Sequence, residues 1–105
     1  MTISLETVVL AFLSGVIGGN AFPHFVKGIT REAYPNVFGN GPVTNVVTGW
    51  AGLVIAAALA YYANFQQNPL ESLLIGSLGV LLIGLFHARV GAFGRSGLRR
   101  NDQGH

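Results

Sequence analysis

Long apolar stretches separated by short polar ones are the main pattern in this chain. Residues 3–26 carry one charge, Glu6, residues 43–65 carry none, and residues 70–90 carry charges only near their two ends. Each stretch is long enough to cross a bilayer, because a helix rises ~1.5 Å per residue and the hydrocarbon core is ~30 Å thick. None of them alternates like a strand. The pattern predicts an all-α integral membrane protein with three transmembrane helices.

The composition also indicates lipid as the solvent. Of 105 residues, 50% are hydrophobic and 10% are charged, whereas about a quarter of the residues of a soluble domain are charged. The polar residues are too few to cover a water-soluble core. There is no cysteine, which excludes disulfides, thiolate metal sites and iron–sulfur clusters. We expect one membrane domain over residues 1–105.

Residues that favour helix starts mark the three spans. In "NPLE", Asn68 is expected to cap the third helix, with Pro69 at its first position and Glu71 reaching back to the cap. Pro42 is expected to start the second helix in the same way. Glu6 lies in the first turn of the first helix, where the helix dipole favours an acid.

The basic residues predict the orientation in the membrane. All of them lie in the connector 27–42 or at and after the end of the third span. The positive-inside rule places these segments in the cytoplasm and the N-terminus outside, so the prediction is N-out and C-in. We expect the connector to lie in the membrane interface and the tail 91–105 to be a basic cytoplasmic segment. The residues expected to meet anionic lipid headgroups are Lys27, Arg31, Arg89, Arg95, Arg99 and Arg100.

Small residues recur at every fourth position of each span. Such ridges let membrane helices approach closely, where the hydrophobic effect does not drive them together. They predict either packing among the three helices of this chain, or a docking face for a homo-oligomer or a larger complex. The expected packing residues are Ala11, Gly15, Gly19, Thr48, Gly52, Ala56, Ala60, Gly76 and Gly84.

Two histidines are the candidate cofactor ligands. His24 and His87 lie close to Lys27 and Arg89, so both are expected near the cytoplasmic interface at similar depth. Together they could hold a haem or a chlorophyll-type pigment, with Asn20 orienting His24. The alternative is that both are interfacial side chains that bond to water, lipid phosphate or a backbone carbonyl freed by Pro23. This alternative makes "GGNAFPHFVKG", residues 18–28, an exit from the membrane.

The sequence holds no signature of an enzyme or of a nucleic-acid-binding protein. It contains no carboxylate pair, no nucleophile motif and no dinucleotide or Walker fingerprint. The leading hypothesis is therefore a non-enzymatic accessory or structural subunit of a larger membrane complex or of a homo-oligomer. The alternative is a small transporter or channel protomer, which needs a polar lane through the bilayer. The residues available for that lane are Thr44, Asn45, Thr48, Ser72 and Ser77.

Two short motifs resemble those of a group of small bacterial membrane proteins. They are "PHFVKGI" at residues 23–29 and "NVVTGW" at residues 45–50, and they span the end of the first helix to the start of the second. No activity is attached to that group. The resemblance implies a location in the bacterial inner membrane and carries over no functional residue.

Overall fold

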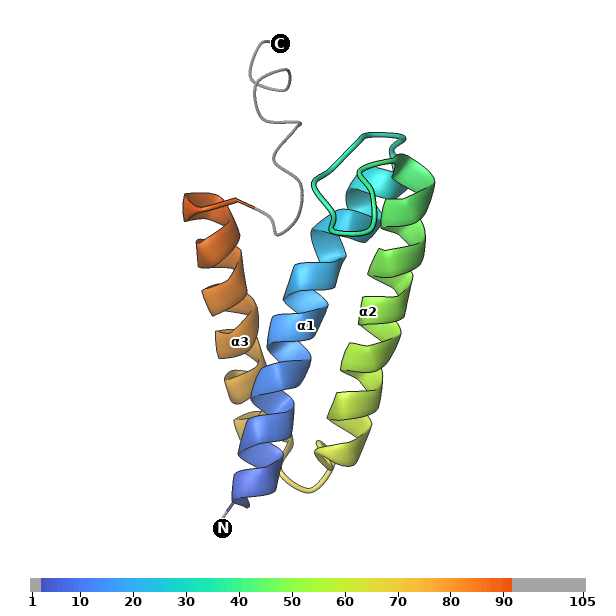
Figure 1. Cartoon of the computed structure of the whole chain (residues 1–105). Coiled ribbons are helices and arrows are strands. Elements are labelled where there is room, and N and C mark those ends of the chain that lie inside the picture. Colours follow the sequence, from blue (N-terminus) through green and yellow to red (C-terminus); the bar gives the residue numbers. More distant parts are fainter. Residues whose placement is uncertain (1–2, 92–105) are drawn as a thin grey trace.

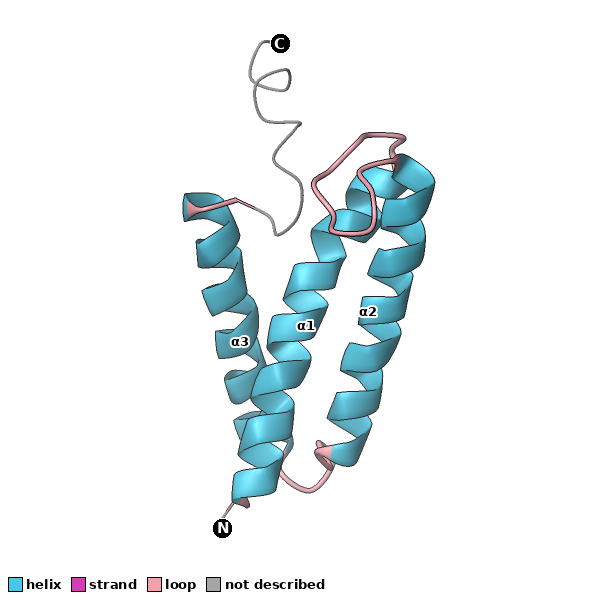
Figure 2. Cartoon of the chain, in the orientation of Figure 1, coloured by secondary structure: helices cyan, strands magenta, loops and turns pink. Residues whose placement is uncertain are grey.

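Three helices make up most of the chain that the structure describes, residues 3–91 of a computed structural model (Figure 1). They are α1, Leu5–Ile29, α2, Pro42–Tyr62, and α3, Pro69–Arg89. Within residues 3–91 there is no strand (Figure 2). All three helices are long and apolar enough to cross a membrane. The predicted fold class, an all-α membrane protein with three spans, is confirmed.

Local signals set the start of each helix. Ser4 caps α1, since its Oγ accepts a hydrogen bond from the Thr7 amide at 3.1 Å, and prolines occupy the first position of α2 and α3. The side-chain cap expected from Asn68 is wrong. Asn68 stands at the N-cap position but forms no cap bond, because its ψ of 64° departs from the extended backbone of a capping residue.

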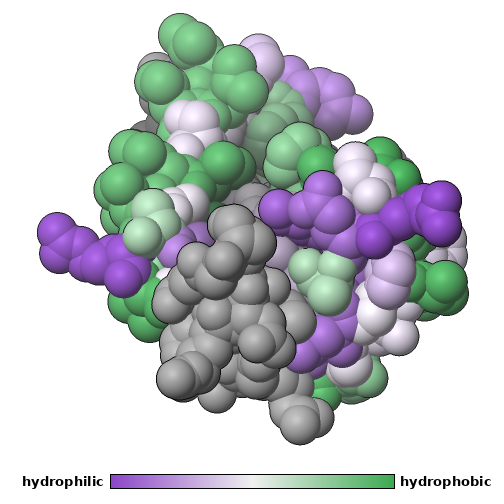
Figure 3. Space-filling view, turned by 90° about the horizontal axis from the view of Figure 1, so that it is seen from above, coloured by the Kyte–Doolittle hydropathy of each residue, from purple (hydrophilic) through white to green (hydrophobic). Residues whose placement is uncertain are grey.

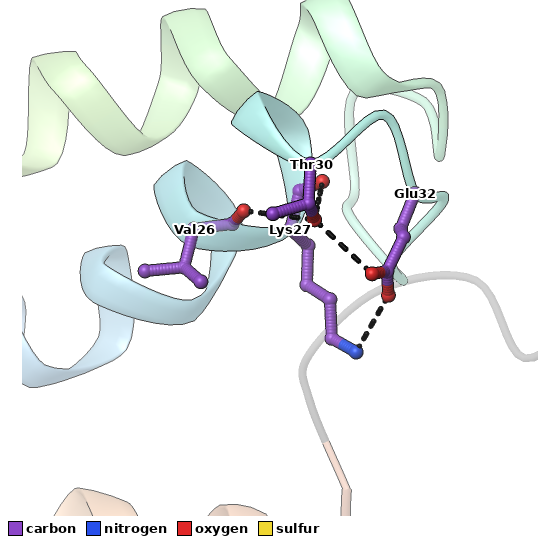
Figure 4. Close-up of polar contacts among 4 residues, drawn as sticks. All are labelled: Val26, Lys27, Thr30 and Glu32. Carbon is purple, nitrogen blue, oxygen red and sulfur yellow. Dashed lines mark hydrogen bonds and ion pairs between the residues drawn. The ribbon is translucent and has the colours of Figure 1, made fainter.

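The end of α1 is set by Thr30 rather than by Pro23. The helix continues through Pro23 to Ile29, beyond the boundary expected at residue 26. The Thr30 hydroxyl donates to the carbonyls of Val26 and Lys27, at 3.2 and 3.0 Å, and so satisfies groups that a helix end leaves open (Figure 4). The Glu32 carboxylate completes this turn by accepting a hydrogen bond from the Thr30 hydroxyl.

Glu32 links the helix end to the connector. Its Oε1 accepts from Lys27 Nζ at 2.9 Å, and its Oε2 accepts from the Thr30 hydroxyl at 3.1 Å (Figure 4). The hydrogen bond from Lys27 and the one from Thr30 both lower the pKa of the Glu32 carboxyl. The pair is exposed, so it orients the first residues of the connector and adds little stability.

The helices form a flat row with α1 in the middle (Figure 1). α1 contacts both α2 and α3, whereas α2 and α3 make no contact with each other among the described residues. α2 and α3 are kept apart because they contact different sides of α1. The side of α1 toward α2 holds residues 14, 18, 21, 25 and 28, and the side toward α3 holds residues 12, 15, 16 and 19. At 3.6 residues per turn these two sets point in nearly opposite directions. The row therefore has two broad faces, and each exposes a side of α1.

Glycines bring α1 and α3 into close contact. A Cβ on Gly15 would overlap the backbone of Gly76, and a Cβ on Gly79 would overlap the backbone of α1 at Phe12. On Gly19 it would lie 2.7 Å from Ile83 Cγ2. Gly84 lies outside this contact: an added Cβ there would meet no atom of the described residues, because Gly84 is on the side of α3 that faces away from α1. α3 also diverges from α1 toward its C-terminus (Figure 1).

Glycines also bring α1 and α2 into close contact. A Cβ on Gly49 would lie 2.6 Å from the Phe25 nitrogen, and one on Gly52 would lie 2.6 Å from the Ala21 Cβ. Ser14 strengthens this contact, since its hydroxyl donates to the Ala56 carbonyl at 2.7 Å. The small residues of α1 and α2 are thus used for packing within the chain.

The spacing of the packing residues differs from the expected step of four. The buried residues of α2 and α3 follow a seven-residue pattern: Asn45, Gly49, Ala56 and Ala63, and Ser72, Gly79 and Ile83. Residues four apart on a helix are rotated by about 40° relative to each other, so a series of such residues leaves the contact face within a few members. Alternating spacings of four and three residues keep the series on that face. Thr48 and Ala60 accordingly lie beside the contact line, half-buried, and Gly84 is exposed.

The orientation in the membrane remains a prediction, which a topology reporter tests. Polar residues gather at the connector end of the row (Figure 3), where Lys27 and Arg89 lie in the last turns of α1 and α3. Arg95, Arg99 and Arg100 lie outside the described residues. A reporter active only in the cytoplasm is expected to work when fused to residue 105 and to be silent at the N-terminus. The opposite result would reverse the orientation.

Candidate functional site

Asn45 is the centre of a buried polar network at the connector end of the row. Its side chain, 0% exposed, donates through Nδ2 to the carbonyls of Tyr34, Asn40 and Gly41 at 3.0, 3.1 and 3.0 Å. Carbonyls only accept hydrogen bonds, so the amide nitrogen must point toward the connector. The Oδ1 atom of Asn45 then points toward α1 and can only accept.

Asn36 attaches the connector to α2. It is 4% exposed, and its Nδ2 donates to Asn45 Oδ1 at 3.1 Å and to the Thr48 hydroxyl at 2.7 Å. Its Oδ1 accepts from the Phe38 amide, and its own amide donates to Asn40 Oδ1, both at 3.0 Å. Both side-chain N–H groups and the Oδ1 atom of Asn36 are bonded, so the connector is held to the helices by defined bonds.

His24 joins this network from α1. The ring is 7% exposed, and its Nδ1 lies 2.6 Å from Asn45 Oδ1. Because that oxygen accepts, Nδ1 carries the proton, and in the neutral ring Nε2 is an acceptor. Tyr34 packs edge-on against the ring at a centroid distance of 5.0 Å. Burial raises the pKa of the Tyr34 phenol, which keeps it neutral.

The Nε2 atom of His24 is available for a ligand. Among residues 3–91 this atom has no hydrogen-bond partner. It is also not one of the fully buried side-chain atoms of that range that lack a partner. His24 lines a cleft of about 340 Å³ on one broad face of the row, between α1, α2, the connector and Ile83 of α3. A histidine held through Nδ1–H with a free Nε2 is the arrangement that proteins use for bases and ligands.

His87 lies at a different hollow. Its Nε2 is 2.9 Å from Asn20 Oδ1, and it lines a space of about 480 Å³ with Phe22, Val80 and Gly84 among others. The residues of α1 that line this hollow, 18, 19, 22 and 23, are on the opposite side of the helix from those that line the His24 cleft, 16, 17, 20, 21 and 24.

This geometry corrects two expectations about the histidines. Asn45, not Asn20, orients His24, while Asn20 pairs with His87. The two rings line different spaces, His24 the cleft and His87 the hollow, and a haem or pigment held by both stays a prediction. His24 is also not an interfacial side chain exposed to water and headgroups, because it is buried against Asn45 and Tyr34.

The polar lane considered for transport is not formed by the described residues. Asn45 and Thr48 bond to the connector at one end of the row, and Ser72 is buried near the other end. Ser77 bonds to the Leu74 carbonyl of its own helix at 2.8 Å. Between them residues 53–60 of α2 are all apolar.

No protein-family model, curated protein or solved structure matches this chain. Within residues 3–91 no three His, Cys, Asp or Glu side chains form a group able to hold a metal ion. The site is therefore characterised by its own geometry, a polar network beside a cleft that one of its members, His24, lines.

The network was not predicted from the sequence, although the sequence contains one signal of it. Asn45 lies in an apolar segment without charge, where an unpaired amide is unfavourable and implies a partner. That partner is formed by Asn36 and three connector carbonyls. Only the fold of the connector brings them to Asn45.

Proposed function

We propose that this protein is a small non-enzymatic subunit of the bacterial inner membrane, which binds another membrane helix through α3. The partner is a second copy of the chain or a subunit of a larger complex. The proposed contact is the α3 face, defined as Ser77, Leu81, Gly84 and Ala88. These residues alternate in spacings of four and three, as residues on one side of a packed helix do, and all of them are exposed.

One observation carries the proposal: among the residues that the structure describes, Gly84 makes no close contact that would require a glycine. An added Cβ there would meet no atom within 4 Å, whereas Gly76 and Gly79 on the same helix pack against α1. Small residues on a membrane helix permit close approach of a neighbouring helix. Gly84 also borders the hollow of about 480 Å³ beside His87, which a side chain of the partner can enter.

Substitution of Gly84 tests this proposal. We expect Gly84→Leu to abolish the assembled species when the protein is extracted in native lipids and weighed by native mass spectrometry. The control is Ala58→Leu, an equally exposed position on α2. It should leave assembly unchanged, since α2 is not part of the proposed contact.

Two outcomes would contradict the proposal. One is a wild-type protein that is monomeric and brings no partner from the membrane. The other is an assembly that survives Gly84→Leu and is lost in Ala58→Leu, which would move the contact to α2.

A further inference from the structure

The cleft beside His24 is polar at one end and apolar at the other. The polar lining residues His24, Asn36 and Thr48 lie in or next to the connector, which also contributes the apolar Val37 and Phe38. Farther along α1 it is lined by Val16 and Ile17, with Ile83 opposite. The eight residues from Val16 to His24 correspond to about 12 Å along the helix axis. A ligand that fills the cleft therefore has a polar head at the interface and an apolar part toward the membrane centre.

Two polar atoms in the cleft have no partner among the described residues. One is His24 Nε2, an acceptor in the neutral ring because Nδ1–H bonds to Asn45. The other is Asn20 Nδ2, a donor, since Asn20 uses Oδ1 to accept from His87. The remaining polar side chains of the lining, Asn36 and Thr48, are bonded within the network.

The acceptor and the donor lie one helical turn apart on the same side of α1. Residues four apart on a helix have Cβ atoms roughly 6 Å apart, and both residues line the cleft, so a small head that lies between their side chains is near both. The head must donate one hydrogen bond and accept another. A protonated carboxyl group does both within one group, with its O–H directed to His24 and its C=O to Asn20.

We propose that this cleft binds a single-chain carboxylic acid amphiphile, a free fatty acid. The carboxyl group bonds to His24 Nε2 and Asn20 Nδ2, and the first part of the chain lies along Val16, Ile17 and Ile83. Because α2 and α3 do not touch, the rest of the chain leaves sideways into the bilayer. A volume of about 340 Å³ is at the lower end for ligand sites, which suits a head and a short length of chain.

Electrostatics favours this head over other lipid heads. The acid and the imidazole share one proton, so the bound pair is neutral overall whether the proton is on oxygen or nitrogen. A phosphodiester is ionised and has no proton of its own to donate to the ring, so the ring would have to take a proton from water before the pair could be neutral. An alcohol donates to His24 but offers no carbonyl to Asn20.

The experiment measures binding of palmitic acid to the full chain in nanodiscs of defined phospholipid without free fatty acid. Its methyl ester has the same chain and carbonyl but no acid proton, and we expect it to bind at least about tenfold more weakly. Hexadecanol is expected to fall between them. Equal binding of acid and ester, or no binding above that of empty nanodiscs, would overturn the proposal.

Two variants complete the test. Ile17→Trp fills the apolar part of the cleft without touching the network, and it should abolish palmitic acid binding at unchanged thermal stability. Asn20→Leu should weaken binding of the acid by about tenfold and leave binding of hexadecanol unchanged. Wild-type affinity in Ile17→Trp, or a quinol that displaces the acid at lower concentration, would assign the cleft to something else.

This inference is independent of the proposed function. The cleft and the Gly84 hollow are on opposite sides of α1. Loss of assembly in Gly84→Leu with fatty acid binding intact, or the reverse, would separate the two.

Discussion

Asn45→Leu is expected to lower the free energy of unfolding by about 3 kcal/mol, although leucine has nearly the same shape. The change removes the donor to the Tyr34 carbonyl and the acceptor for His24 and Asn36. The Asn40 carbonyl still accepts from the backbone amide of Tyr34, and the Gly41 carbonyl still accepts from the backbone amide of residue 45. The Tyr34 carbonyl, the His24 Nδ1–H and one of the two N–H groups of Asn36 lose their partner, while the other N–H of Asn36 still bonds to Thr48. Each lost partner costs at least about 1 kcal/mol. Reversible unfolding in mixed micelles measures the loss.

Thr44→Val is the matched control for this change. Thr44 precedes Asn45 on α2 and is half-buried, but its hydroxyl forms no hydrogen bond in the described part of the chain. We expect its effect to stay within about 0.5 kcal/mol. Limited proteolysis should cut the connector faster in Asn45→Leu and not in Thr44→Val. Equal stability of the two variants would show that the network does not hold the connector.

The three spans could be predicted because their positions depend mainly on one free-energy cost, that of placing a charge in the membrane. A charge inside the hydrocarbon core is so unfavourable that the uncharged stretches alone locate the helices. The ends were less predictable, since they depend on local bonds. α1 passes Pro23 and stops where the Thr30 hydroxyl bonds to the last carbonyls, and these bonds are not apparent from hydropathy.

The packing faces could be predicted only in part. Residue type indicated that glycines would lie at contacts, and Gly15, Gly52 and Gly76 do. The rotation of one helix against another depends on both surfaces together, so the sequence of α3 alone could not tell that Gly79 faces α1 while Gly84 faces outward.

The site was the least predictable part. His24 was chosen for its chemistry and its depth, yet its partner Asn45 is on another helix and 21 residues away. Which ring nitrogen is free follows from the carbonyls that fix Asn45, and these belong to the connector. A long connector has too many conformations for its sequence to determine such contacts.

Gly15→Ala is expected to destabilise the protein through a single methyl group. The added Cβ would overlap the Gly76 backbone, and backbone atoms of a packed helix cannot move aside as a flexible side chain can. α3 must shift away from α1 along the half where they pack. Overpacking of this kind costs about 1–3 kcal/mol, and the same unfolding assay measures it.

The same substitution on α3 separates this clash from a general effect of removing glycine. At Gly84 an added Cβ meets no atom, and alanine favours a helix more than glycine does. Gly84→Ala should therefore leave the stability of the isolated chain unchanged or raise it slightly. If Gly15→Ala and Gly84→Ala behave alike, α1 and α3 do not pack as closely as described. A loss only in Gly15→Ala would show that α1 and α3 pack closely at Gly15 and that the Gly84 side of α3 is free of such contacts.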